Sequence, residues 1–223
     1  MNSDKNTPRF LGAAFLLQAV AALVWTYLLT SLIVTGDISA SMTNIANNTL
    51  QMRASILFTM ITAIGIVMIG VLMYIILKKQ NRNIAIVAMG LYLLEAAILA
   101  ASRIQAFSLL RLSQESVIAG HPAHFQTLGN LFYESADFGD WLHMLPFALG
   151  ATLFYYLFYK SGYIPRALSL FGLIAALLAL IGTLFGLLGY DVPIVVFLLS
   201  LPFELTIGVW LMVKGIRDGS ETE

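Results

Sequence analysis

Six apolar stretches, each about as long as a bilayer is thick, constrain this chain more than any other feature. A helix needs roughly 20 residues to cross about 30 Å of hydrocarbon at about 1.5 Å per residue. Hydrophobic residues make up 59% of the chain and charged residues only 11%. The stretches cover residues 10–34, 55–77, 84–110, 138–159, 168–188 and 192–213. We therefore predict an all-α, polytopic membrane bundle with six transmembrane helices, forming one membrane domain over residues 1–223.

The distribution of basic residues predicts the orientation of this bundle. Lysine and arginine are retained on the cytoplasmic face of a membrane protein. Six crossings place on one side Lys5, Arg9, Lys78, Lys79, Arg82, Lys160, Arg166, Lys214 and Arg217. Of the 12 basic residues, only Arg53, Arg103 and Arg111 remain for the other side. We therefore expect both termini in the cytoplasm and a multi-pass protein of the cytoplasmic membrane.

The segment between the third and fourth stretches, residues 113–137, is expected to be an outer loop. Its apolar residues recur at near-helical spacing, as Val117, Phe125, Leu128 and Phe132 illustrate. This spacing predicts an amphipathic helix that lies on the outer membrane face or caps the bundle.

Three short segments of the chain are distinctive: Ile164–Ile174 (IPRALSLFGLI), Gly208–Ile216 (GVWLMVKGI), and Leu77 with the two lysines that lead into the helix carrying Glu95. Together they resemble domain-of-unknown-function family 4386. The resemblance implies a six-helix membrane protein of bacteria or archaea without an assigned activity. In that family an arginine often stands three residues before the glutamate. Here that position is Tyr92, so Glu95 needs a different partner.

Two glutamates, Glu95 and Glu204, lie near the middle of apolar stretches. A carboxylate in hydrocarbon is costly, so each should be paired, protonated or facing a polar cavity. Glu95 lies about 16 Å into its helix, close to the bilayer centre, and Glu204 lies at similar depth. Pro202 removes a backbone donor near Glu204, so we expect a kink that exposes carbonyl groups there. The alternative is a structural role in which these groups only join helices.

Further polar residues are expected to complete this site. Tyr92 shares a helix face with Glu95, whereas Arg103 lies about 12 Å further out. We expect Arg103 to meet Glu204, Asp140 or His143 from other helices, because an isolated buried ion is unfavourable. The predicted intramembrane polar cluster consists of Glu95, Arg103, His143, Glu204, Asp140 and Tyr92.

A metal site is a weaker interpretation of the histidines. Asp140 and His143 are three residues apart, a spacing that lets two side chains hold one metal ion. With His121 and His124 from the preceding segment, they are compatible with the zinc site of a membrane hydrolase. However, Pro122 interrupts the histidine pair, and histidines in loops are more often solvated. We keep a metal-dependent hydrolase as an alternative and predict no cofactor.

The remaining sequence features restrict the class of function. The chain has no cysteine and equal numbers of basic and acidic residues, so neither disulfides nor nucleic-acid binding is expected. It also contains no phosphate-binding glycine loop and no nucleophile elbow. We expect a non-enzymatic protein of the lipid bilayer whose polar interior binds a small amphiphile or lipid, or passes a solute or protons. A structural or partner-binding subunit is the other alternative, and a homodimer is compatible with both.

Overall fold

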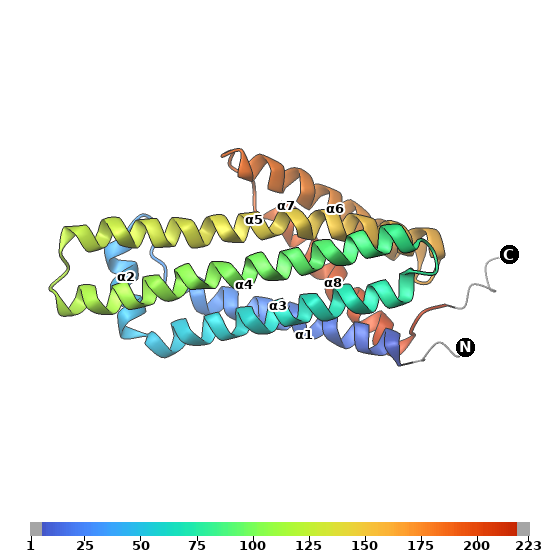
Figure 1. Ribbon diagram of the computed structural model, residues 1–223, viewed down its shortest axis with the longest axis horizontal. Helices are drawn as coiled ribbons and strands as arrows, with labels where there is room; N and C mark the ends of the chain where they lie inside the picture. Colours follow the sequence, from blue (N-terminus) through green and yellow to red (C-terminus); the bar gives the residue numbers. More distant parts are fainter. Residues whose placement is uncertain (1–5, 218–223) are drawn as a thin grey trace.

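The computed structural model describes residues 6–217, and the regular structure in that range is entirely α-helical (Figure 1). The helices are α1 (Thr7–Thr30), α2 (Ile38–Asn47), α3 (Thr49–Leu77), α4 (Arg82–Ile118), α5 (Ala123–Ser161), α6 (Arg166–Leu187), α7 (Val195–Leu198) and α8 (Ser200–Val213). Within the described range, six segments are long and apolar enough to cross a membrane, the sixth being Val195–Val213. The predicted all-α bundle with six spanning segments is therefore confirmed.

The spanning helices form a closed ring. α1 packs on α3, α3 on α4, α4 on α5 and α5 on α6, while α8 contacts both α1 and α6 (Figure 1). The links at 78–81 and 162–165 are short, which makes the helices on either side antiparallel neighbours. Asn81 caps α4 by accepting a hydrogen bond from the backbone N–H of Ile84 at 3.0 Å. Gly162 ends α5 in a left-handed conformation, with φ of 66°.

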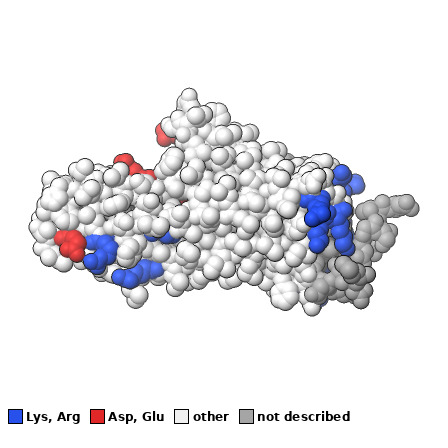
Figure 2. All heavy atoms as spheres, viewed as in Figure 1, with Lys and Arg blue, Asp and Glu red and all other residues white. Residues whose placement is uncertain are grey.

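Basic side chains gather at one end of the ring. α1 begins and α8 ends there, and the two short links lie at the same end (Figures 1 and 2). The basic residues in these segments are Arg9, Lys78, Lys79, Arg82, Lys160, Arg166, Lys214 and Arg217. Lys5, which the charge argument also used, lies outside the described residues. We call this the basic end and the opposite one the outer end.

The segment predicted as an outer loop at 113–137 is helical except for a turn at 119–122. α4 has 37 residues and α5 has 39, so each is more than about 55 Å long and extends well beyond about 30 Å of hydrocarbon. The apolar spacing seen in the sequence thus continues the two spanning helices instead of forming a separate surface helix. The result is a helical hairpin that projects from the outer end (Figure 1).

A second apolar core explains why this hairpin stays helical. Leu109 and Leu110 of α4 pack with Met42 and Ile45 of α2, and Phe132 of α5 lies against the same cluster. α2 begins at an Asp37 cap, whose Oδ1 accepts from the N–H of Ala40 at 2.9 Å. The main core, between the spanning helices, is a separate cluster.

The helical hydrogen-bond pattern of the sixth span is interrupted at Leu199, close to Pro202, although Leu199 keeps helical dihedral angles, with φ of −66° and ψ of −24°. The kink expected at Pro202 stays a prediction. α7 ends at Leu198 and α8 begins at Ser200, so the interruption precedes the proline by a few residues. Proline has no N–H to donate to the carbonyl four residues earlier, which is that of Leu198. The interruption therefore occurs where the helical hydrogen bond is missing.

Candidate functional site

The structure places the six predicted site residues in two groups. Arg103 and Asp140 form an ion pair, and His143 lies within electrostatic range of Arg103. Glu95 and Glu204 lie within electrostatic range of each other, and Tyr92 is within range of both. The two groups are separated by about 12 Å along α4, the rise from residue 95 to residue 103. We call Arg103 and Asp140 the outer pair, and Glu95 and Glu204 the inner acid pair.

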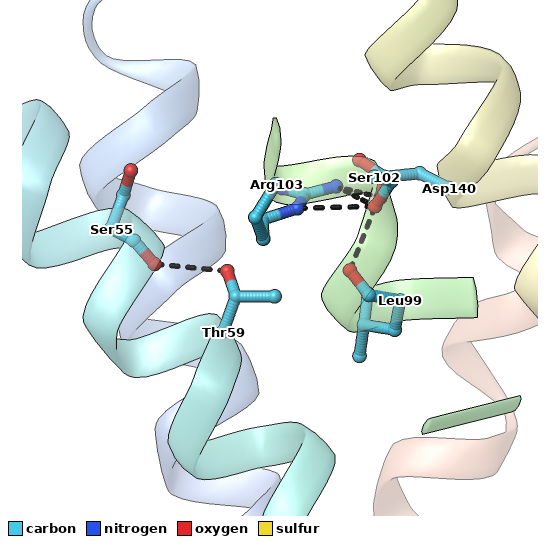
Figure 3. A network of polar contacts seen from close by, with 6 residues as sticks. All are labelled: Ser55, Thr59, Leu99, Ser102, Arg103 and Asp140. Carbon is cyan, nitrogen blue, oxygen red and sulfur yellow. Dashed lines mark hydrogen bonds and ion pairs between the residues drawn. The ribbon is translucent and has the colours of Figure 1, made fainter. Parts of the chain in front are cut away.

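The outer pair joins α4 to α5. Arg103 has only 4% of its side chain exposed, and its Nη2 donates to Asp140 Oδ1 and to Ser102 Oγ, the latter at 2.9 Å. Figure 3 shows the arginine and aspartate side chains directed toward one another with Ser102 beside them. Ser102 in turn donates to the carbonyl of Leu99 at 2.8 Å. Arg103 is thus held in one orientation by groups from two helices.

Aromatic and hydroxyl groups from α1 and α3 surround the same arginine. The guanidinium carbon lies 5.3 Å from the centre of the Trp25 ring, a cation–π arrangement. Thr59 of α3 stands opposite in Figure 3, but its hydroxyl donates to the carbonyl of Ser55 at 2.9 Å. The hydroxyl therefore stabilises its own helix and does not donate to the outer pair.

A cavity of about 320 Å³ lies beside the outer pair. Its walls come from α1, α3, α4, α5 and the segment after α1. The lining residues are Trp25, Thr26, Leu29, Thr30, Ile33, Thr35, Met52, Arg103, Ala106, Leu109, Tyr133, Ala136, Asp137 and Asp140. This volume is at the lower end of the range for small-molecule sites, and the lining combines apolar walls with a few polar groups. We call it the outer cavity.

Two polar groups on residues that line the outer cavity have no partner in the described range. The indole Nε1 of Trp25 is buried and has no hydrogen-bond partner among the described residues. Asp137 is exposed and forms no ion pair within residues 6–217, whereas Asp140 is occupied by Arg103. The wall therefore offers one unused donor and one unused carboxylate.

Asp140 also lies on the wall of a second cavity of about 320 Å³, which is mostly apolar. The other lining residues are Trp141, Met144, Val192, Ile194 and Phe197. The cavity lies between α5 and the segment that contains α7, close to where the helical pattern of the sixth span is interrupted. The outer cavity, which has several polar groups, and this more apolar cavity thus share the Asp140 carboxylate.

The inner acid pair has a different environment. Glu95 is 3% exposed and Glu204 is 9% exposed, and neither forms an ion pair within residues 6–217. Oε2 of Glu95 and the hydroxyl of Tyr92 are buried without a hydrogen-bond partner in the described range. Tyr155 of α5 is 2% exposed and lies within electrostatic range of both glutamates. Its ring packs on Phe203, with ring centres 4.4 Å apart.

The histidines do not form the metal site considered from the sequence. Among the described residues, no group of three or more His, Cys, Asp or Glu side chains is placed to hold a metal ion. His121 and His124 lie at the tip of the hairpin, and α5 is continuous, so His143 is about 28 Å further along it than His124. The set His121, His124, His143 and Asp140 is therefore dispersed, and the metal-dependent hydrolase loses its structural basis.

Several residues at these two groups were not predicted as site residues. Trp25 and Tyr133 line the outer cavity, and Tyr155 belongs with the inner acid pair. Tyr155 lies near the end of α5, together with Tyr156 and Tyr159. The latter two are 42% and 43% exposed, but Tyr155 faces inward. Its helical phase with the small residues Ala148 and Ala151 was a signal that could have found it.

Fold and site together define a six-helix integral membrane protein with charged groups inside the bundle. The chain belongs to the domain of unknown function family DUF4386, whose family model matches residues 10–215. No curated protein and no solved structure matches this chain.

Proposed function

We propose that this protein binds a small amphiphile in the outer cavity, with its polar group beside Arg103, Asp140 and Asp137. The observation that carries the proposal is the ion pair at the wall of a cavity of about 320 Å³. A buried ion pair has a large desolvation cost and stabilises a fold poorly. Its position at a cavity is better explained by recognition of a polar ligand group.

The lining supports an amphiphile rather than a fully polar solute. Leu29, Ile33, Met52 and Leu109 give the outer cavity an apolar side, while Thr26, Thr30, Thr35 and Tyr133 give it a polar side. Asp140 connects this surface with the apolar second cavity. A molecule with one polar and one apolar part can satisfy both surfaces at once.

The proposed orientation places the outer cavity at the external leaflet of the cytoplasmic membrane. Lysine and arginine favour the cytoplasmic side, and the basic end carries most of them. The chain lacks cysteine, so single cysteines report orientation directly. A membrane-impermeant thiol reagent added to intact cells should label the Gly120→Cys variant. It should leave the Gln80→Cys variant unlabelled.

Trp25 provides a direct test of ligand binding. In a variant with Trp141→Phe and Trp210→Phe, Trp25 is the one remaining tryptophan of three. We expect lysophosphatidylcholine with a brominated acyl chain to quench Trp25 fluorescence saturably in nanodiscs.

A cavity-filling variant provides a second test. Ala136→Trp, with Trp25 unchanged, should fill the cavity and abolish binding. Its binding is measured by competition with a radiolabelled lysolipid. Its control, Ala101→Trp, lies on the exposed face of α4 and should leave binding unchanged.

The proposal fails if quenching rises linearly with lipid and never saturates, because that is partitioning into the bilayer. It also fails if Ala136→Trp and Ala101→Trp bind the lysolipid equally well.

A further inference from the structure

The inner acid pair has no role in the outer cavity. Neither glutamate lies on the wall of that cavity, and the pair is about 12 Å closer to the basic end than Arg103 is. Its members come from two helices on different sides of the ring, Glu95 from α4 and Glu204 from α8. Two buried carboxyl groups within electrostatic range of each other thus lie in the interior of a membrane protein.

No basic side chain compensates them among the described residues. Both ion pairs in that range lie elsewhere, at Arg103 with Asp140 and at Arg111 with Glu115. Arg103 is already engaged by Asp140, Ser102 and Trp25. Other basic residues of the spanning helices lie toward the helix ends, such as Arg82 and Lys160.

Two tyrosines lie within electrostatic range of the pair, one on the helix of Glu95 and one on the neighbouring α5. Tyr92 of α4 and Tyr155 of α5 interact electrostatically with both glutamates, and each is 2% exposed. From α1, α3 and α6 the surrounding core contributes apolar residues such as Phe15, Ile66 and Ala176. Among the described residues, these neighbours contribute hydroxyl groups and apolar side chains, and no basic side chain forms an ion pair with either glutamate.

The packing around Tyr92 leaves little space for a ligand. A Cβ added at Gly70 would lie 2.9 Å from the Tyr92 Cβ, and one added at Gly150 would lie 2.8 Å from its ring. The backbones of α3 and α5 thus press directly on this side chain. A metal ion is not supported either, since no group of three His, Cys, Asp or Glu side chains forms within residues 6–217.

We propose that Glu95 and Glu204 form a proton-binding site at mid-depth in the membrane, with Tyr92 and Tyr155 as its hydroxyl partners. Two carboxylates close together in a low-dielectric interior cannot both remain charged without a cation. A bound proton removes that cost and needs no cavity. Oε2 of Glu95 and the hydroxyl of Tyr92, three residues apart on α4, are an acceptor and a donor that are both buried without a hydrogen-bond partner in the described range. This site is distinct from the proposed amphiphile site and does not depend on it.

Infrared spectroscopy of the full-length protein in nanodiscs tests this proposal. Protonated carboxyl groups and carboxylates absorb at different frequencies, and isotope labelling of the glutamate carboxyl carbons separates them from aspartates. We expect a protonated glutamate band at neutral pH. Glu95→Gln and Glu204→Gln should each reduce this band, and the double variant should abolish it. The control Glu115→Gln changes an exposed residue and should leave the band intact.

The Tyr92→Phe variant distinguishes two explanations of the band: glutamates that share a proton-binding cluster with tyrosine hydroxyls, and glutamates that are protonated only because they are buried. Loss of its hydroxyl should shift the frequency of the glutamate band, whereas Tyr159→Phe, at an exposed tyrosine, should not. The proposal is overturned if the labelled glutamates of the unmodified protein are all ionised at neutral pH. It is equally overturned if the band persists in the double variant, or if Tyr92→Phe leaves its frequency unchanged.

Discussion

The outer pair and the inner acid pair accommodate buried charge in opposite ways. At the outer pair, an arginine and an aspartate compensate each other next to a cavity. At the inner acid pair, two like groups lie together in a tightly packed region with no cation in the described range. The comparison shows that acidic residues in apolar helices indicate where polar chemistry occurs, but their partners decide which chemistry it is.

The largest expected effect is at the outer pair. Asp140→Asn leaves Arg103 buried without a counter-charge and should lower the free energy of unfolding by about 3 kcal/mol. Thermal unfolding in detergent measures this loss. Asp137→Asn, an exposed acid on the same helix, is the matched control and should change stability by less than about 0.5 kcal/mol. Equal effects of the two variants would show that the ion pair is not a distinct feature.

Replacing both residues of the outer pair tests whether the ion pair serves the fold or ligand binding. Arg103→Met combined with Asp140→Leu removes both charges, and we expect stability to return to within about 1 kcal/mol of the unmodified protein. Lysolipid binding should nevertheless be lost, because the polar group has no partner left. Retained binding together with restored stability would mean that the ion pair serves the fold alone.

The surroundings of the two pairs also differ in packing density, because the outer pair lies beside a cavity and the inner acid pair lies in a tightly packed region. Gly150→Ala places a methyl group against the Tyr92 ring and should destabilise the protein by about 1–3 kcal/mol. Gly90→Ala is the matched control, because a Cβ there meets no atom within 4 Å. It should leave stability unchanged or raise it by up to about 1 kcal/mol through helix propensity. If Gly150→Ala is tolerated as well as Gly90→Ala, the inner region is looser than the structure shows.

The smallest effect is expected at the inner acid pair itself. Glu95→Gln keeps the size of a neutral glutamic acid and should change the free energy of unfolding by less than about 1 kcal/mol at neutral pH. Chemical unfolding of the variant beside the unmodified protein measures the difference. A change as large as that for Asp140→Asn would indicate that Glu95 is ionised and paired.

Much of the fold followed from the sequence because hydrocarbon imposes strict lengths on its helices. The six apolar stretches and the hydrogen bond that Pro202 cannot make are local properties, and the structure shows six spanning segments with an interruption of the helical pattern at Leu199. The extension of α4 and α5 was missed because the apolar spacing of residues 113–137 is the same for a surface helix and for a longer hairpin. Packing against α2, which the spacing cannot show, decides between them.

The site was harder to predict. Glu95, Arg103 and Glu204 could be singled out because charge is rare in these stretches. Their separation into two groups depends on which helices are neighbours in the ring and how each is rotated, and no single helix encodes either. Tyr155 illustrates this limit. Its helical phase places it on the same face of α5 as Ala148 and Ala151, but the packing of α5 in the ring decides that this face points inward.

The independence of the two pairs is the central claim, and a double-mutant cycle tests it most directly. The unfolding free energies of Asp140→Asn, Glu204→Gln and the combined variant are compared with that of the unmodified protein. Sites about 12 Å apart without shared partners should give effects that add within about 0.5 kcal/mol. A coupling above about 1 kcal/mol would show that the charged groups form one network and would contradict the two-site account.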